Sequence, residues 1–291
     1  MPQRVNARDG RALAVYEDGD PQGVPVVVHH GTPASGLLYR SWVKLAREQR
    51  IRLIGYDRPG YGGSTRHAGR SVADAAGDVE AIADALGLER FATWGVSGGG
   101  PHALACAALC DDRLAAVASL AAVAPYEASG LDWVDGMGEG NVVEFGAVLE
   151  GEPALRQLLE REAEEMRHAQ TADVVVLLET LLGTSDRAVL DHEFADELLQ
   201  SDRHGLASGI DGWLDDDFAF ARPWGFDVAT TDRPVLLLHG ADDRFVPIAH
   251  GRWLAERVRG VEARLTGDED GHLTLIARRI REVHEWLLAH I

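Results

Sequence analysis

Along the first half of the chain, short apolar runs alternate with longer segments in which small and apolar residues recur at helical spacing. Residues 24–28 form a Val-rich run, which is typical of a strand buried on both faces of a parallel sheet. Residues 71–89 place apolar side chains on one face of a helix that Gly87 is expected to end. This alternation predicts a mainly parallel sheet whose strands are joined by right-handed helical crossovers.

The same patterns place the other elements of the expected α/β fold. Strands are predicted near residues 11–19, 24–31, 51–56, 90–96, 113–125, 233–239 and 262–266. Helices outside the middle of the chain are predicted near residues 71–89, 99–110, 249–258 and 273–289.

The middle of the chain, from about residue 126 to residue 226, has helical patterns and no convincing strand. Residues 152–169, for example, place several leucines on one stripe. No Gly/Ser-rich linker flanks this block, so it is expected to be a lid rather than an independent domain. The predicted organisation is therefore a core of residues 1–125 and 227–291 with a helical lid inserted at residues 126–226.

Composition and charge narrow the possible partners. The chain has 291 residues, 46% of them hydrophobic, and a formal net charge of −19. Such an acidic surface disfavours nucleic acids and anionic membranes as partners. No apolar run approaches the roughly 18 residues of a membrane span, and no signal segment precedes Val5. Cys106 and Cys110 fit small buried apolar side chains better than a disulfide, so a cytoplasmic protein of unspecified oligomeric state is expected.

A serine stands in the tightest part of a glycine run. Residues 95–99 read G-x-S-x-G, with a predicted strand before them and a predicted helix after them. In such a turn the glycines allow a close backbone approach that a Cβ atom would prevent. The helix N-terminus also favours a negative oxygen nearby. The structural alternative is that Ser97 only caps this helix.

Four segments together give the chain its resemblance to a known family. They are HHGTP at residues 29–33, DRPGYGGS at 57–64, GVSGGG at 95–100, and HGADDRFVP at 239–247 followed by DGHLTL at 270–275. Over nearly its whole length the chain resembles the α/β-hydrolase family, in its serine esterase and proline-iminopeptidase-like branch. The resemblance implies a mostly parallel central sheet with flanking helices, a helical lid, and a triad in the order Ser, acid, His.

The candidate base is His272. A serine hydroxyl such as that of Ser97 is a poor nucleophile unless a base takes its proton. Among twelve histidines, His272 follows the last predicted strand, directly behind Gly271, where a turn can present it across the carboxyl edge of the sheet. By contrast, His284 lies in the last predicted helix and is expected on the surface.

The candidate acid is Asp243. An acid would hold the imidazole of the base in the correct tautomer and stabilise its cationic form. The resemblance places this acid three residues after the glycine that ends a strand, which is Gly240 here. Asp242 is the competing carboxylate and is expected to be a solvated neighbour.

The resemblance also implies backbone donors for an oxyanion. One is the N–H of Gly98, and the other is the N–H of Thr32, whereas Pro33 has no N–H to offer. Candidate walls of the substrate pocket are Trp133, Met137, Phe145, Phe245 and Leu273. No metal-binding spacing and no dinucleotide motif is present, so neither a metal nor another cofactor is expected.

Three functions fit these residues. The favoured one is a carboxylesterase or lactonase for small or medium apolar acyl groups, because related dehalogenases and epoxide hydrolases have Asp where this chain has Ser97. The second is a proline-iminopeptidase-like aminopeptidase, with lid acids from residues 160–166 or 214–218 holding a substrate amine. These acidic residues are expected to lie on solvent-exposed faces of helices rather than in an amine-binding site. The third is a receptor that binds without turnover. In each case the expected partner is a small molecule, an ester or amide if the chain is an enzyme.

Overall fold

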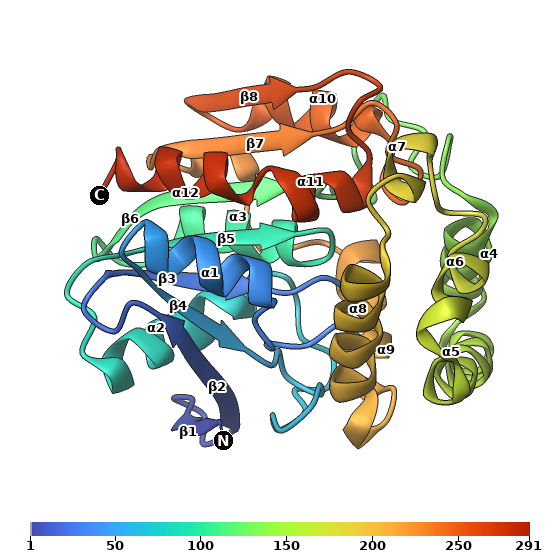
Figure 1. The fold of residues 1–291 in the computed structure, drawn as a ribbon, viewed down its shortest axis with the longest axis horizontal. Coiled ribbons are helices and arrows are strands. Elements are labelled where there is room, and N and C mark those ends of the chain that lie inside the picture. The colour runs from blue at the N-terminus through green and yellow to red at the C-terminus, as the bar shows by residue number, and fades with distance from the viewer. Residues whose placement is uncertain (1) are drawn as a thin grey trace.

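A single twisted sheet of eight strands forms the centre of the computed structural model, which describes residues 2–291 (Figure 1). Its strands are β1 (Gln3–Asn6), β2 (Ala12–Gly19), β3 (Val24–His29), β4 (Ile51–Tyr56), β5 (Phe91–Val96), β6 (Leu114–Leu120), β7 (Val235–His239) and β8 (Val261–Leu265). Their order in the sheet is β1-β2-β4-β3-β5-β6-β7-β8. Only the β1–β2 and β2–β4 pairs are antiparallel.

Helices cover both faces of this sheet, which confirms the predicted α/β class. One face carries α1 (Arg40–Glu48), α11 (His272–Arg278) and α12 (Ile280–Leu288). The other carries α2 (Asp74–Leu86), α3 (Gly99–Leu109) and α10 (Ile248–Arg257) (Figure 1). Each face has its own hydrophobic core.

Local sequence explains the central elements. All six residues of β5 are buried, and residues 26–28 of β3 are buried as the Val-rich run predicts. Helix α2 ends at Gly87, which adopts the left-handed conformation with φ +64°. The sequence pattern missed β1, a four-residue strand at the edge of the sheet that pairs antiparallel with β2.

The end of the chain differs from the prediction in two respects. The last helix is divided at Arg279, whose backbone has φ −102° and ψ −4°, into α11 and α12. The expectation that His284 lies on the surface is wrong. His284 is buried because α12 packs against the sheet and α1, where its Nδ1 lies 3.0 Å from Gln49 Oε1.

A block of helices joins β6 to β7. It contains α4 (Glu139–Glu150), α5 (Glu152–His168), α6 (Val174–Leu177), α7 (Thr184–Arg187), α8 (His192–Gly205) and α9 (Asp211–Ala221). We call residues 126–226 the helical block; as described in the structure, they include no strand. The block lies beyond the carboxyl ends of the parallel strands, on the right of Figure 1.

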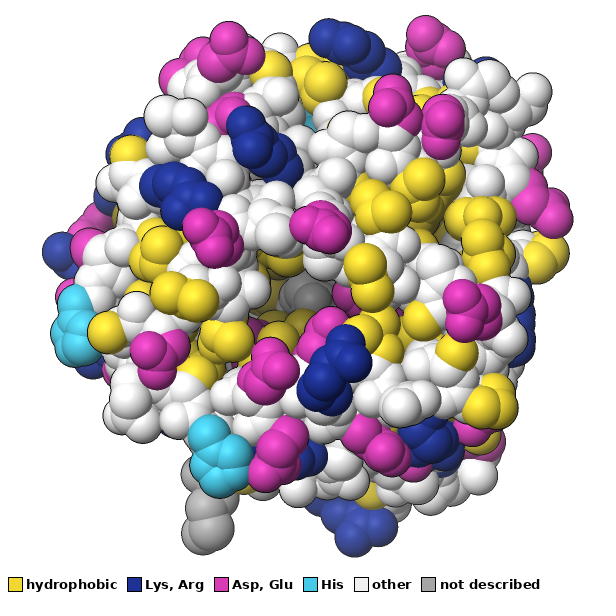
Figure 2. Space-filling view, turned by 90° about the vertical axis from the view of Figure 1, so that its right-hand side faces the viewer, with side chains coloured by type: hydrophobic (Ala, Val, Ile, Leu, Met, Phe, Trp, Pro, Cys, Tyr) yellow, Lys and Arg dark blue, Asp and Glu magenta, His cyan; other side chains and the backbone are white. Residues whose placement is uncertain are grey.

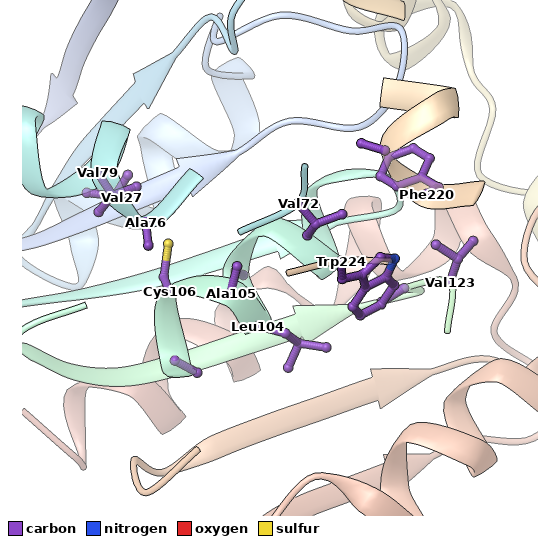
Figure 3. Close-up of a cluster of buried hydrophobic side chains, with 14 of the residues drawn as sticks. Val27, Val72, Ala76, Val79, Leu104, Ala105, Cys106, Val123, Phe220 and Trp224 are labelled. Atoms are coloured by element: carbon purple, nitrogen blue, oxygen red, sulfur yellow. The ribbon is translucent and has the colours of Figure 1, made fainter. Parts of the chain in front are cut away.

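The helical block shares a hydrophobic core with the sheet. Figure 3 shows Trp224, just after α9, beside Val123, which follows β6. Phe220 of α9 belongs to the same core cluster. Deeper in the cluster, Cys106 is fully buried near Ala76, in agreement with its expected role as a small apolar side chain. Within residues 2–291, no helix is both long enough and apolar enough to cross a membrane.

Candidate active site

Ser97 occupies a sharp turn between β5 and α3, at the carboxyl edge of the sheet. Its backbone is left-handed, with φ +54°, a conformation that non-glycine residues rarely adopt. Gly95 is required in this turn because a Cβ atom there would lie 2.1 Å from the carbonyl oxygen of Gly99. The turn places Ser97 among the residues that line a cavity beneath the helical block.

His272 and Asp243 come together beside the same cavity. His272 Nδ1 lies 2.8 Å from Asp243 Oδ2, and both side chains are buried. Asp243 Oδ1 accepts a further hydrogen bond of 2.8 Å from the amide of Val246, which fixes the carboxylate. The ring of Phe245 stacks on the imidazole with 4.4 Å between centroids. If Nδ1 carries the proton that this carboxylate accepts, Nε2 of His272 remains free to accept a proton.

The pKa of His272 reflects two opposing effects. Burial lowers the pKa because it disfavours the imidazolium form. The charge of Asp243, its hydrogen bond, and the charge of Asp186 outweigh burial, so the pKa of His272 is raised above its ordinary 6.5. By contrast, burial lowers the pKa of His102 to about 3, so this neighbour of Ser97 stays neutral.

Thr32, in the loop after β3, packs directly against Gly98, in the turn that carries Ser97. A Cβ atom on Gly98 would lie 2.2 Å from Thr32 Oγ1. Thr32 Oγ1 donates a hydrogen bond of 2.8 Å to Asp216 Oδ2 and accepts one of 3.1 Å from Arg58 Nη2. Arg58 also donates to the carbonyl oxygens of His30 and Gly31. The loop after β3 is therefore held beside the turn that carries the serine.

Asp216 of α9 is the centre of a buried ion-pair network. Its Oδ2 accepts a hydrogen bond of 2.6 Å from Arg58 and one of 2.8 Å from Tyr61, and its Oδ1 accepts one of 2.7 Å from Arg70. Burial acts to raise the pKa of Asp216, but the charges of Arg58 and Arg70 prevail and hold it well below the ordinary value. Arg58, which belongs to the DRPGYGGS segment, therefore ties the loop after β3 to the helical block.

The cavity between the sheet and the helical block has a volume of about 290 Å³. Figure 2 shows the face that carries the block, which is hollowed near its centre between hydrophobic and acidic side chains. Three of the five candidate wall residues, Phe145, Phe245 and Leu273, line the cavity. Trp133 and Met137 do not line it and lie in the hydrophobic core instead. There, Trp133 Nε1 donates a hydrogen bond of 2.7 Å to the carbonyl oxygen of residue 124.

Five carboxylates also line this cavity, whereas no lysine or arginine of residues 2–291 does. The five are Glu144, Glu162, Glu165, Asp202 and Asp217. The expectation that the acids of residues 214–218 form a solvated face is wrong, since Asp215, Asp216 and Asp217 are all buried. Within the described residues, no three His, Cys, Asp or Glu side chains are placed to hold a metal ion.

Three of these carboxylates come from three neighbouring helices, Glu144 from α4, Glu162 from α5 and Asp217 from α9. Burial raises the pKa of Glu162 to about 7, and the charge of Glu144 adds to the shift. Burial, and then the charge of Glu144, raises the pKa of Asp217 well above its ordinary value. Trp213 Nε1 donates a hydrogen bond of 2.6 Å to Glu144, whereas Oδ2 of Asp217 is buried without a partner among the described residues.

Asp242 is not the solvated neighbour that the sequence analysis expected. Its Oδ2 accepts hydrogen bonds of 2.7 and 2.8 Å from the amide and hydroxyl of Ser185 in α7. Asp242 therefore contacts the helical block, while Asp243 contacts His272. This division of roles agrees with the choice of Asp243 as the partner of the histidine.

The fold and these residues agree with a family comparison. The family model of the alpha/beta hydrolase fold matches residues 24–276, and this chain belongs to that family. Among solved structures, bromoperoxidase from Bacillus anthracis superposes with a TM-score of 0.71 at 22% identity, covering 99% of this chain and 100% of that one. An esterase from Thermogutta terrifontis superposes with a TM-score of 0.68 at 22% identity, covering 100% of both chains.

Curated relatives match this chain over very different lengths. A probable oxidoreductase from Mycobacterium tuberculosis is 42% identical over 65 residues, which are 22% of this chain and only 11% of the relative. Proline iminopeptidase from Xylella fastidiosa is 34% identical over 102 residues, which are 34% of this chain and 32% of the relative. A bifunctional esterase/perhydrolase from Acinetobacter calcoaceticus is 25% identical over 260 residues, 88% of this chain and 87% of the relative. The chain is thus similar to members with several different activities.

Proposed function

We propose that this chain is a serine hydrolase that cleaves a carboxylic ester or amide through an acyl-enzyme on Ser97. Ser97 Oγ attacks the carbonyl carbon while Nε2 of His272 takes the hydroxyl proton, and Asp243 stabilises the imidazolium. The imidazolium then gives that proton to the leaving alcohol or amine. Water next attacks the acyl carbon, with His272 again as the base, and releases the acid and the free serine.

The amides of Thr32 and Gly98 are proposed to stabilise the oxyanion of each tetrahedral intermediate. Support comes from their position side by side, since a Cβ atom on Gly98 would overlap with Thr32 Oγ1, at 2.2 Å. The network of Arg58 and Asp216 keeps the Thr32 loop in place. In this proposal the helical block acts as the lid, since it covers the cavity into which Ser97 faces.

The preferred substrate carries a protonated amine close to the scissile acyl group, as an N-terminal amide or an amino-acid ester does. One observation supports this choice above all. Five carboxylates line the cavity beside Ser97, and no lysine or arginine of residues 2–291 lines it to neutralise them. An ammonium group would give Glu144, Glu162 and Asp217 the counter-charge that the described residues do not provide there. The local similarity to proline iminopeptidase points in the same direction.

A neutral ester of a small or medium apolar acid is the second candidate. The rest of the cavity wall favours it, because Phe145, Phe245 and Leu273 offer an apolar surface next to the serine. The similarity to an esterase/perhydrolase over most of the chain supports the same reading. The two candidates share the acyl-enzyme step and differ only in the charge of the substrate.

Matched substrates separate the two candidates. Prolyl, alanyl and leucyl p-nitrophenyl esters or anilides are compared with their N-acetylated forms, and p-nitrophenyl butyrate serves as the neutral reference. We expect kcat/KM at least tenfold higher for the free amines, which corresponds to about 1.4 kcal/mol of recognition. Equal rates for free and acetylated substrates would favour the neutral ester. Ser97→Ala should abolish both activities, and a fluorophosphonate probe should label wild type at Ser97.

Tight binding without turnover or labelling would reject the enzymatic proposal in favour of a receptor.

A further inference from the structure

A four-residue helix of the helical block, α7, lies between the two loops that carry Asp243 and His272. On one side, the amide and hydroxyl of Ser185 donate to Asp242 Oδ2 at 2.7 and 2.8 Å, and Asp242 is the residue directly before Asp243. On the other side, the next residue of α7, Asp186, reaches the loop of His272. Adjacent residues of one short helix thus hold both loops.

Asp186 bonds to the backbone of the histidine itself. Its Oδ2 accepts a hydrogen bond of 2.9 Å from the amide of His272, and its Oδ1 accepts one of 2.9 Å from the amide of Thr274. These are amides of the first turn of α11, which have no acceptor within the helix. The side chain of Asp186 is fully buried, so solvent does not compete for the two bonds.

The charges around the imidazole of His272 come from few groups. Asp243 and His239 face it from the loop and strand of β7, and Asp186 faces it from α7. Burial lowers the pKa of His239, which is therefore neutral near pH 7. Asp186 is the only acidic group of the helical block that raises the pKa of the histidine among the described residues.

We propose that Asp186 is a positioning residue for His272, through which the helical block controls the placement of the base. The two amide bonds fix the first turn of α11, and the bond from Ser185 to Asp242 fixes the neighbouring loop of Asp243. The relative positions of Asp243 and His272 then depend on α7 remaining in contact with both loops. As a positioning role in catalysis, the proposal rests on the acyl-enzyme mechanism given above.

The test compares Asp186→Asn and Asp186→Ala with Ser185→Ala and with a matched control, Asp78→Asn. Asp78 is also a buried carboxylate, paired with Arg11 at 2.8 Å, but it lies on α2, on the opposite face of the sheet from α11. Each variant is assayed for kcat and KM on p-nitrophenyl butyrate, for the pH profile of kcat/KM, and for thermal stability.

We expect Asp186→Asn to lower kcat at least tenfold with KM changed less than twofold, because the substrate contacts remain while the base is misplaced. The rise of kcat/KM with pH should move to lower pH, since a charge that favours imidazolium is lost. Asp186→Ala should lose more activity, and Ser185→Ala less. Asp78→Asn should lower the melting temperature and leave kcat and the pH profile unchanged.

A folded Asp186→Asn protein with wild-type kcat and pH profile would overturn the proposal. So would losses of kcat that follow melting temperature equally in Asp186→Asn and Asp78→Asn. If wild type proves inactive, the proposed function fails separately, and the imidazole NMR signals of His272 still test the positioning. Its pKa should then be lower in Asp186→Asn than in wild type, and an unchanged pKa would count against Asp186.

Discussion

Thr32 Oγ1 donates a hydrogen bond of 2.8 Å to Asp216 Oδ2, so the loop after β3 is fastened to helix α9 of the helical block. The same carboxylate pairs with Arg58 at 2.6 Å and with Arg70 at 2.7 Å. All these side chains except that of Thr32 are nearly or completely buried. The proposed oxyanion loop and the proposed lid therefore form one ion-paired unit, and its integrity should affect both stability and catalysis.

Asp216→Asn should lower the free energy of unfolding by about 3 kcal/mol or more, because two guanidinium groups stay buried without their counter-charge. Urea unfolding at pH 7 measures this. Asp215→Asn is the control, since Asp215 pairs mainly with the partly exposed Arg66 and its loss should cost less. Equal losses in the two variants would show that the buried ion pairs of Asp216 contribute no more to stability than those of Asp215. Because the pKa of Asp216 is lowered, its contribution should persist at neutral pH and vanish only in acid below about pH 4.

The two neighbouring carboxylates in the loop after β7 should behave differently. Asp243→Asn disturbs the tautomer of His272 and should lower kcat by about four orders of magnitude, as the corresponding change does in a serine protease. Asp242→Asn leaves the His272–Asp243 pair in place and only weakens the bond to Ser185, so kcat should fall by about tenfold or less. Steady-state kinetics on one ester decides the ranking, and the reverse order would identify Asp242 as the orienting acid.

The cavity walls give a further prediction about acyl chain length. Phe145→Ala should extend the preferred acyl group, because Phe145 lines the cavity and its removal enlarges it. Trp133→Phe should leave the preference unchanged, since Trp133 packs behind Phe145 with 4.4 Å between ring centroids and does not line the cavity. Rates on p-nitrophenyl acetate, butyrate, hexanoate and octanoate provide the measurement. An unchanged preference in Phe145→Ala would remove the helical block from substrate selection.

The core of the fold followed from local patterns in the sequence. Apolar runs such as that in β3 define strands buried on both faces, and the glycine spacing around Ser97 defines the turn between β5 and α3. These strands and this turn depend on a few neighbouring residues, which is why the sequence alone reveals them. The choice of Asp243, three residues after Gly240, rested instead on the resemblance to the α/β-hydrolase family, and the structure places its Oδ2 2.8 Å from His272 Nδ1.

The interior of the helical block depends on tertiary contacts and was mostly not predictable. Helical spacing shows which side chains share a face, but not whether that face meets solvent, arginines or a cavity. One signal was available. Three consecutive residues, Asp215 to Asp217, point in directions about 100° apart and cannot share one solvated face. The contacts of Asp186 could not be predicted, because its partners are backbone amides, which are present in every sequence.

The pH dependence should reveal the environment of His272. Catalysis needs the neutral imidazole, and the pKa of His272 is raised above 6.5 because the carboxylates outweigh burial. With a neutral ester, kcat/KM should therefore rise through a single ionisation above pH 6.5 and stay level at mildly alkaline pH. In Asp243→Asn the residual activity should rise at lower pH. A profile that falls steadily from pH 5 upward would require a protonated acid in the rate-limiting step and would exclude His272 as the base.

Glu162 should make recognition of an amine depend on pH and should lower stability. Its pKa is raised to about 7, so KM for an ammonium substrate should fall as pH rises through 7, while KM for p-nitrophenyl butyrate stays constant. A carboxyl group with a raised pKa in the folded state loses its proton more readily when unfolded. The free energy of unfolding therefore decreases as the pH rises from about 4.5 to about 7. Glu162→Gln removes that decrease.

We expect Glu162→Gln to unfold in urea at a higher midpoint than wild type at pH 8, with little difference at pH 4.5. At about pH 7.5, where Glu162 is mostly ionised and an α-amino group of pKa about 8 is still mostly protonated, the same variant should raise KM for the ammonium substrate several-fold and leave KM for the neutral ester unchanged. Glu164→Gln is the matched control, because Glu164 lies on the same helix but is exposed and pairs with Arg167. If Glu162→Gln and Glu164→Gln act alike on both quantities, the carboxylates of the cavity do not bind an amine.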